Sequence, residues 1–301
     1  MYRAGHRNVG SKIMRCDQLC AIARRYLGER YEFSLVSPPP PRNPARQVRF
    51  ARQCRGAVVI LLKHVERVLV GDAIAELRAG ARAICVDYVD SPPTAAFAPL
   101  VDVHIAASRA GLEMLRERLS GDGYAPRPGA EIRLVTHHAD PRIRPRPQPD
   151  CGELRLLYLG NPDNTYIPAA AAADVALAGY GRDDNFASAL AAAAGYNMHY
   201  CIRRRPHSAP KPFTKGFNAA AFDRNLLVNR QVDDAEHYLG ADYPFFVDSL
   251  KPQAIADGIA KAKSLVGSPE WQRGLGAVRE MRKRCAPARV AAELGDILAM
   301  F

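Results

Sequence analysis

Short apolar runs alternate regularly with segments of helical periodicity, and this alternation constrains the fold more than any other feature of the sequence. In the first half the apolar runs lie at residues 31–36, 57–62, 83–86, 101–108 and 131–136. Between them, apolar residues recur every three to four positions, as in an amphipathic helix. Strands that alternate with helices at this spacing favour a parallel sheet covered on both faces. The first half is therefore predicted to be a Rossmann-like domain.

A proline-rich stretch at residues 140–150 interrupts both periodicities and is typical of a stiff linker. Beyond it the alternation resumes, with apolar runs at 154–160, 196–202, 225–229 and 243–247 and predicted helices near 185–194, from 215, and at the C-terminus. The sequence thus predicts an α/β protein of two Rossmann-like domains, 1–145 and 146–301, with a helical C-terminus.

The start of the first domain is unusual. Domains of this class normally open on an apolar strand, and here only Met1 to Ala4 precede the glycine-containing turn at residues 5–11. Either that strand is a stub or the chain starts late.

Charge and cysteine content limit the class of partner and the compartment. The chain has 42 Lys and Arg against 31 Asp and Glu, a net charge of +11 that favours anionic partners and would suit peripheral association with an anionic membrane surface. The arginines are spread along the chain and aromatic residues make up only 8%, so we do not expect nucleic-acid binding. The seven cysteines include no Cys-x-x-Cys pair, and we see neither a signal peptide nor a membrane span, so we expect a cytoplasmic protein.

The stretch KPFTKGFNAA at residues 211–220 places two lysines at the start of a predicted helix. Lysine at that end opposes the helix dipole, whereas free N–H groups and the positive end of the dipole suit a phosphate. We therefore predict a phosphate site made by Lys211, Thr214, Lys215 and Gly216, with the glycine giving the phosphate room. The alternatives are that Thr214 caps the helix and that both lysines are solvated charges.

Other candidates follow predicted strands, at the sheet edge where open α/β sheets bind ligands. Arg203 extends the strand at 196–202 and is the arginine of the 203–205 triplet that we expect at the site, although all three could be surface residues. Asp233 and Asp234 follow the strand at 225–229 and either reach a ribose or cap a helix. No Asp-x-Asp motif points to a metal, and we expect none.

Histidines and aspartates at strand ends or on the first turn could act as a general base, a group that removes a hydroxyl proton. The candidates are His6, His64, Asp87, Asp90, His137 and His138. Each histidine alone is as well explained by a structural role, and the aspartates by loop capping.

The arrangement of two similar Rossmann-like halves, a linker and a helical C-terminus resembles the GT-B glycosyltransferases over nearly the whole chain. The most specific part is the second half, where YNMHYCIRRR, KPFTKGFNAA, LLVNRQVDD and LGADYPFFV follow in order. The resemblance implies two domains that face each other across a cleft, the acceptor on the first and the nucleotide-sugar on the second. It also implies that the last helix packs back on the first domain, and that an Arg/Lys pair, here Arg203 and Lys215, neutralises the departing diphosphate. The two glutamates eight residues apart that mark many retaining members are absent.

The sequence thus predicts a bacterial glycosyltransferase that moves a sugar from a nucleotide-sugar to an acceptor hydroxyl of a glycan, lipid-linked or small-molecule acceptor. No cofactor is expected, because the nucleotide-sugar is itself a substrate. Two alternatives remain: a nucleotide-sugar epimerase of the same fold, and a catalytically silent protein that binds nucleotide-sugars or glycans.

Overall fold

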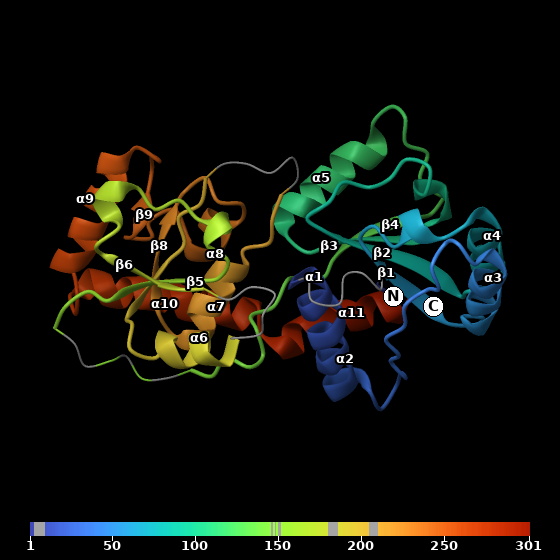
Figure 1. Ribbon diagram of the computed structural model, residues 1–301, viewed down its shortest axis with the longest axis horizontal. Coiled ribbons are helices and arrows are strands. Elements are labelled where there is room, and N and C mark those ends of the chain that lie inside the picture. The colour runs from blue at the N-terminus through green and yellow to red at the C-terminus, as the bar shows by residue number, and fades with distance from the viewer. Residues whose placement is uncertain (3–9, 146, 148, 150–151, 180–185, 205–209) are drawn as a thin grey trace. The chain divides into compact units, whose positions relative to one another are not determined.

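A computed structural model shows two compact α/β units (Figure 1). It describes all residues except 3–9, 146, 148, 150–151, 180–185 and 205–209. Unit 1 comprises Met1–His137, Pro287–Phe301 and the described part of Ser208–Pro212. Unit 2 comprises the described parts of His138–His207 and Phe213–Ala286.

Unit 1 contains a parallel sheet of four strands in the order β1-β2-β3-β4. The strands are β1 Val58–Leu62, β2 Ala83–Val89, β3 Val103–Ala106 and β4 Glu131–Leu134. β1 and β2 pair without a break, whereas the register between β2 and β3 shifts between Asp87 and Val89, at the carboxyl end of β2. The four apolar runs at 57–62, 83–86, 101–108 and 131–136 are therefore confirmed as strands.

The helices of unit 1 come from both ends of the chain. They are α1 Gly10–Lys12, a π-helical segment Ile13–Gln18, α2 Leu19–Leu27, α3 Pro44–Gln53, α4 Gly71–Gly80, α5 Arg109–Ser120 and α11 Pro287–Leu298. Ser108 caps α5, since its side chain accepts a hydrogen bond from the Gly111 N–H. The C-terminal helix α11 packs against α2, and Val290 and Leu294 share a buried cluster with Leu19 and Ile105.

Unit 2 contains a parallel sheet of five strands in the order β6-β5-β7-β8-β9. The strands are β5 Leu156–Leu159, β6 Val175–Ala178, β7 Met198–Tyr200, β8 Asn225–Asn229 and β9 Phe246–Val247. The helices are α6 Phe186–Ala193, α7 Thr214–Phe222, α8 Ala235–Leu239, α9 Pro252–Ser264 and α10 Pro269–Arg284. Proline occupies the first position of α9 and α10, where its missing N–H costs no helical hydrogen bond.

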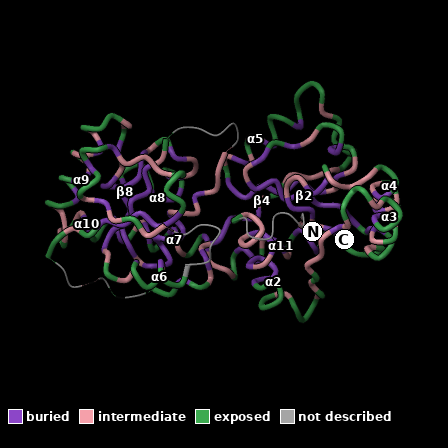
Figure 2. The backbone as a smooth tube through the Cα atoms, in the orientation of Figure 1, coloured by how far each residue is buried: buried purple, intermediate pink, exposed green. Residues whose placement is uncertain are grey.

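The strands β2 and β3 of unit 1 and β5, β7 and β8 of unit 2 are buried, as the purple parts of Figure 2 show, whereas the edge strands β4 and β6 are mostly half-buried. In unit 2 the main cluster gathers β5, β7 and β8 with α7, α9 and α10 around Tyr158, Phe217 and Trp271. Strands buried on both faces explain why the sequence shows continuous apolar runs rather than alternation.

Two strand assignments from the sequence need correction. Residues 31–36 form no strand, although Tyr31 and Phe33 pack on the cluster that joins α2 and α11. β6 lies in an alanine-rich stretch in which we had assigned no strand, because small side chains give no periodic signal.

The described part of the chain contains no helix long and apolar enough to cross a membrane.

Candidate functional site

The ammonium group of Lys215 lies at the carboxyl end of the unit 2 sheet, at the start of α7. Its Nζ donates to the Tyr158 hydroxyl at 2.7 Å and to the Leu159 carbonyl at 3.3 Å, and lies 4.0 Å from the centre of the Tyr158 ring. The Tyr158 hydroxyl in turn donates to the Asn161 carbonyl at 2.5 Å. The end of β5 therefore fixes the position of this charge.

Burial disfavours the charged form of the Lys215 side chain. Desolvation lowers the pKa of Lys215 to about 8, the nearby Cys201 opposes that change, and the positive charge of Arg203 adds to it. Among the described residues no carboxylate lies within ion-pair distance of Nζ. An anion that reached Nζ would stabilise the charged form, so the geometry suits a phosphate.

Gly160 leaves the space in which the ammonium lies. Gly160 follows β5 with φ +140°, a backbone conformation that residues other than glycine rarely adopt. A Cβ at this position would lie 2.7 Å from Lys215 Nζ. Position 160, the last of the predicted strand 154–160, therefore has to be glycine, because a side chain there would collide with the ammonium of Lys215.

The structure changes two of the roles predicted for the start of α7. Thr214 does not cap this helix, because Phe213 is the capping residue and Thr214 is the first helical one. Gly216 has a packing role that we had not foreseen: a Cβ there would lie 2.3 to 2.6 Å from the ring of Phe213. The absence of a side chain at Gly216 makes room for the ring of Phe213. Its predicted role in giving a phosphate room stays a prediction.

Gly216→Ala is therefore expected to lower the free energy of unfolding by about 1–3 kcal/mol, because the buried Phe213 ring would have to move. Thermal unfolding would measure this. Gly276→Ala in α10 is the matched control, since the new methyl meets nothing within 4 Å and should stabilise by about 0.4–1 kcal/mol. If both variants melted at or above the parent temperature, the packing role of Gly216 would be wrong.

Lys211 belongs to unit 1 rather than to the unit that contains Lys215. Its Nζ lies 3.5 Å from Asp90, which also pairs with Lys63. Burial alone would raise the pKa of Asp90, but these two lysines hold it below its usual value. Lys211 and Lys215 thus belong to different units, and their grouping as one phosphate site stays a prediction.

His64 lies in the same part of unit 1, at the carboxyl end of β1. Its Nε2 lies 3.2 Å from the Ser91 hydroxyl, and its φ of +67° is left-handed. Val89 at the end of β2 also has a left-handed backbone, φ +59°, which is costly for a β-branched residue. Such strain persists only where the surroundings enforce it, and it concentrates at functional sites. His64 and Asp90 are the base candidates that the structure brings to one sheet edge.

Asp87 is buried inside unit 1. Its Oδ2 accepts from Arg15 Nε at 2.8 Å, and both side chains are almost wholly excluded from solvent. Arg15 also donates to the Thr136 carbonyl at 3.3 Å, and Glu293 of α11 accepts from the Thr136 N–H at 2.7 Å. This ion pair explains Asp87 as a structural residue, which disfavours the predicted role as a base.

The other candidates lie apart from these groups or outside the described residues. His137 and His138 are buried after β4, and His138 Nδ1 lies 2.7 Å from the Ala139 carbonyl. Asp233 and Asp234 are half-buried in the turn after β8, where Asp234 precedes α8 and its side chain does not cap it. His6 lies outside the described residues. A role in catalysis or ribose binding stays a prediction for all five.

Arg203 follows β7, and its backbone N–H donates to the Asn229 side chain at 3.0 Å. Its positive charge contributes to the lowered pKa of Lys215, after the larger effect of burial. The diphosphate contact itself stays a prediction.

Sequence reasoning missed Tyr158, Gly160, Lys63 and Arg15. Tyr158 and Lys63 each carried a usable signal, because a polar group interrupts or directly follows a continuous apolar run. Arg15 gave none, since an arginine in an amphipathic helix normally faces solvent.

The groups of His, Cys, Asp and Glu within the described residues include none arranged to hold a metal ion. That the protein transfers a sugar without a metal or cofactor stays a prediction.

Comparisons with known proteins bear on the fold. A scan against protein-family models found no match, and a search of curated proteins found no significant one. Among solved structures, a glycosyltransferase from Rickettsia africae ESF-5 is similar with a TM-score of 0.64 and 8% identity, over 97% of this chain and 95% of that one. HepE from Anabaena, solved in complex with UDP, has a TM-score of 0.60 and 10% identity over 100% and 98%.

The α,α-trehalose 6-phosphate synthase from Burkholderia multivorans is also similar, with a TM-score of 0.52 and 10% identity over 98% of this chain and 84% of that one. These likenesses extend over both units and confirm the predicted architecture of two Rossmann-like domains with a helical C-terminus. The chain therefore has the GT-B fold of these glycosyltransferases.

Proposed function

We propose that this protein transfers a sugar from a nucleotide-sugar donor to an acceptor hydroxyl, with the donor diphosphate bound in unit 2 at Lys215. The observation that carries the proposal is the buried ammonium of Lys215, held by Tyr158 and the end of β5 without a carboxylate partner among the described residues. The fold supports it, since solved structures of the same fold are glycosyltransferases and one of them contains UDP.

The chemistry of the step explains why such a charge is useful. When the bond between the sugar and the phosphate breaks, negative charge gathers on the departing diphosphate. A cation fixed beforehand, in a site where water does not screen it, stabilises that charge without having to reorganise. Arg203 would add a second positive charge beside Lys215.

We propose His64 or Asp90 of unit 1 as the group that takes the proton of the acceptor hydroxyl, should the transfer invert the sugar. Of the two, His64 is the better base, because the low pKa of Asp90 makes its carboxylate a weak proton acceptor. A glycan, a lipid-linked glycan or a small molecule would supply the hydroxyl. A cytoplasmic, bacterial setting stays part of the proposal.

UDP is the first probe for this function, because a protein of the same fold was solved with it. A nucleoside diphosphate at 100 times its dissociation constant is expected to stabilise the protein by about 2.7 kcal/mol, which thermal unfolding would detect. Slow hydrolysis of a UDP-sugar without acceptor would then distinguish an enzyme from a silent binder. A panel of nucleoside diphosphates and nucleotide-sugars that leaves the melting temperature unchanged would refute the proposal.

A further inference from the structure

The segment RRYLGERYEF at residues 24–33 contains two Arg-Tyr dipeptides five residues apart and is not used by the proposed function. It comprises the last turn of α2 and the residues that follow that helix. Most of its side chains are exposed, and on the surface of unit 1 the segment lines a hollow of about 700 Å³, here called the 24–33 hollow. Ligand pockets usually measure about 300–1,000 Å³, so the hollow is large enough for a ligand.

The backbone around the 24–33 hollow is fixed to α2. The Tyr31 N–H donates to the Leu27 carbonyl at 3.0 Å. The Arg24 side chain donates to the Phe33 carbonyl through both Nε, at 3.0 Å, and Nη2, at 2.5 Å. The segment therefore holds its shape without a ligand, which lowers the ordering cost of binding one.

Aromatic rings form part of the lining. Tyr26 is 44% exposed, and among the described residues only Leu177 and Met300 are further exposed side chains of large apolar type. Tyr31 and Phe33 are half-buried in the same hollow, with their ring centres 6.3 Å apart in an edge-to-face arrangement. An aromatic ring carries partial negative charge on its face, so the hollow offers surfaces on which C–H groups of a ligand can stack.

Two arginines and two glutamates provide the charges of the lining. The Arg25 guanidinium lies 5.5 Å from the centre of the Tyr26 ring, and Arg24 is bonded to a backbone carbonyl. Within the described part of the chain, Arg25, Glu29 and Glu32 form no ion pair with any residue. The charges of the hollow therefore sum to zero, while hydrogen-bond donors and acceptors stay available to a ligand.

Such a lining disfavours strongly charged ligands. An anion would meet the two glutamates and a cation would meet the two arginines, so each would face a like charge. A neutral molecule rich in hydroxyl groups avoids this, because a hydroxyl can accept from an arginine and donate to a carboxylate. A sugar ring also carries C–H groups on its faces, which can stack on a tyrosine. The lining thus fits a neutral oligosaccharide.

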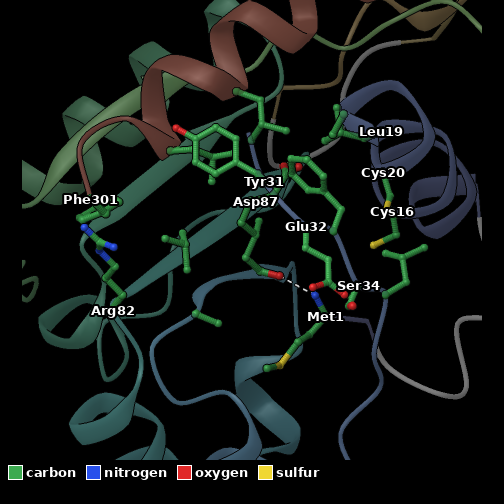
Figure 3. A pocket seen from close by; sticks show the side chains of 18 of the residues that line it. Met1, Cys16, Leu19, Cys20, Tyr31, Glu32, Ser34, Arg82, Asp87 and Phe301 are labelled. Carbon is green, nitrogen blue, oxygen red and sulfur yellow. Dashed lines mark hydrogen bonds between the residues drawn. The ribbon is translucent and has the colours of Figure 1, made fainter. Parts of the chain in front are cut away.

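The same segment borders a deeper cavity of unit 1, of about 580 Å³, which reaches β1 (Figure 3). Figure 3 shows Tyr31 and Glu32 among the side chains that line this cavity. Arg30 lines it as well, and its guanidinium lies 5.4 Å from the centre of the Tyr31 ring. Tyr31 and Glu32 therefore border two open spaces, and substitutions of the exposed side chains around them are expected to change stability little.

We propose that the 24–33 hollow is a glycan-binding surface, which holds a neutral oligosaccharide with one sugar ring against Tyr26. The hydroxyls of the sugar accept from Arg25 and donate to Glu29 and Glu32. The lining of the hollow shares no residue with the donor site at Lys215. It also shares none with the sheet edge that holds His64 and Asp90, so the bound sugars belong to a part of the glycan that does not react.

The test uses the full chain without nucleotide and four neutral trisaccharides as probes: maltotriose, cellotriose, chitotriose and mannotriose. At least one of them is expected to bind and to shift the amide NMR resonances of residues 24–33. Tyr26→Ala should weaken this binding about tenfold, since one stacking contact contributes about 1–3 kcal/mol and 1.4 kcal/mol is a factor of ten. Tyr26→Phe keeps the ring and should bind like the parent. Leu177→Ala, which removes an exposed apolar side chain of unit 2, is the control and should bind like the parent too.

The proposal is wrong if none of the four trisaccharides shifts the resonances of residues 24–33 up to its solubility limit. Equal affinity of the parent and Tyr26→Ala would also overturn it. Binding of a heparin trisaccharide or of phosphatidylglycerol vesicles by a protein that binds none of the four would mean that this surface takes an anion instead. No readout involves a nucleotide or turnover, so failure here is distinguishable from failure of the proposed function.

Discussion

Lys215→Met is expected to remove donor binding and turnover while making the protein without ligand more stable. Methionine keeps the length and much of the apolar stem of lysine but deletes the ammonium that would contact the diphosphate. Loss of a fixed donor of this kind costs about 10²- to 10³-fold in turnover. Burial penalises the same ammonium in the folded protein, so its removal should stabilise by about 1–2 kcal/mol.

The pH dependence gives this prediction a second readout. The pKa of Lys215 is lowered to about 8 in the folded protein, against about 10.4 in an unfolded chain. Below pH 8 both states bind the proton and the penalty is present in full. Between about pH 8 and 10.4 only the unfolded state keeps the proton, so the parent gains stability as pH rises. The advantage of Lys215→Met should therefore be largest below pH 8 and shrink above it.

Lys251→Met is the matched control, because Lys251 is an exposed lysine at the start of another helix, α9. We expect it to change neither melting nor turnover. Calorimetric titration with UDP, thermal unfolding across pH and donor turnover measure the three effects. Parent-like binding and melting for Lys215→Met would mean that this lysine is an ordinary solvated residue.

Asp87→Ala is expected to lower the free energy of unfolding by about 3–5 kcal/mol, because it leaves the guanidinium of Arg15 buried without its counter-charge. Replacing both residues with leucine should recover most of that loss, since a buried ion pair is often matched by apolar residues of similar size. Chemical denaturation of Arg15→Leu, Asp87→Leu and the double variant gives the coupling energy.

The same variants distinguish a structural Asp87 from a catalytic one. If the ion pair is purely structural, the stable double variant should turn over donor like the parent. A double variant that is stable but inactive would restore Asp87 as a base candidate. A mild effect of Asp87→Ala on stability would contradict the buried pair.

The sequence predicted most of the strands correctly because buried parallel strands leave a local mark. The run 57–62 is apolar at every position, and the run 225–229 has three consecutive apolar residues between two asparagines. The helix starts at Ser108, Pro252 and Pro269 were equally readable, since a cap or a first-turn proline lies next to the residues that it serves.

The features that could not be predicted from the sequence depend on contacts with residues far along the chain. Residues 31–36 have the composition of a strand, but a strand needs a neighbour to pair with, and that neighbour is not encoded locally. The burial of Arg15 likewise depends on Asp87, 72 residues away. Gly216, in contrast, depends on a local contact. Phe213 lies three residues earlier, so helical spacing alone predicts that a side chain at position 216 would collide with the Phe213 ring.

The candidate site was predictable in outline only. Strand ends and the lysines of 211–220 identified the region, because ligands of open α/β sheets bind there. That Lys211 belongs to unit 1 and Lys215 to unit 2 was not predictable, since the boundary between the units lies between Pro212 and Phe213.

The packing of α11 against α2 has a consequence for how the chain is made. A ribosome releases the N-terminal residues first, and domains generally fold as units while synthesis continues. The cluster that holds Leu19 and Ile105 also needs Val290 and Leu294, which are translated only after the residues of unit 2. The synthesis of unit 1 therefore starts before that of unit 2 and is completed after it, so the apolar face of α2 stays uncovered while unit 2 is synthesised.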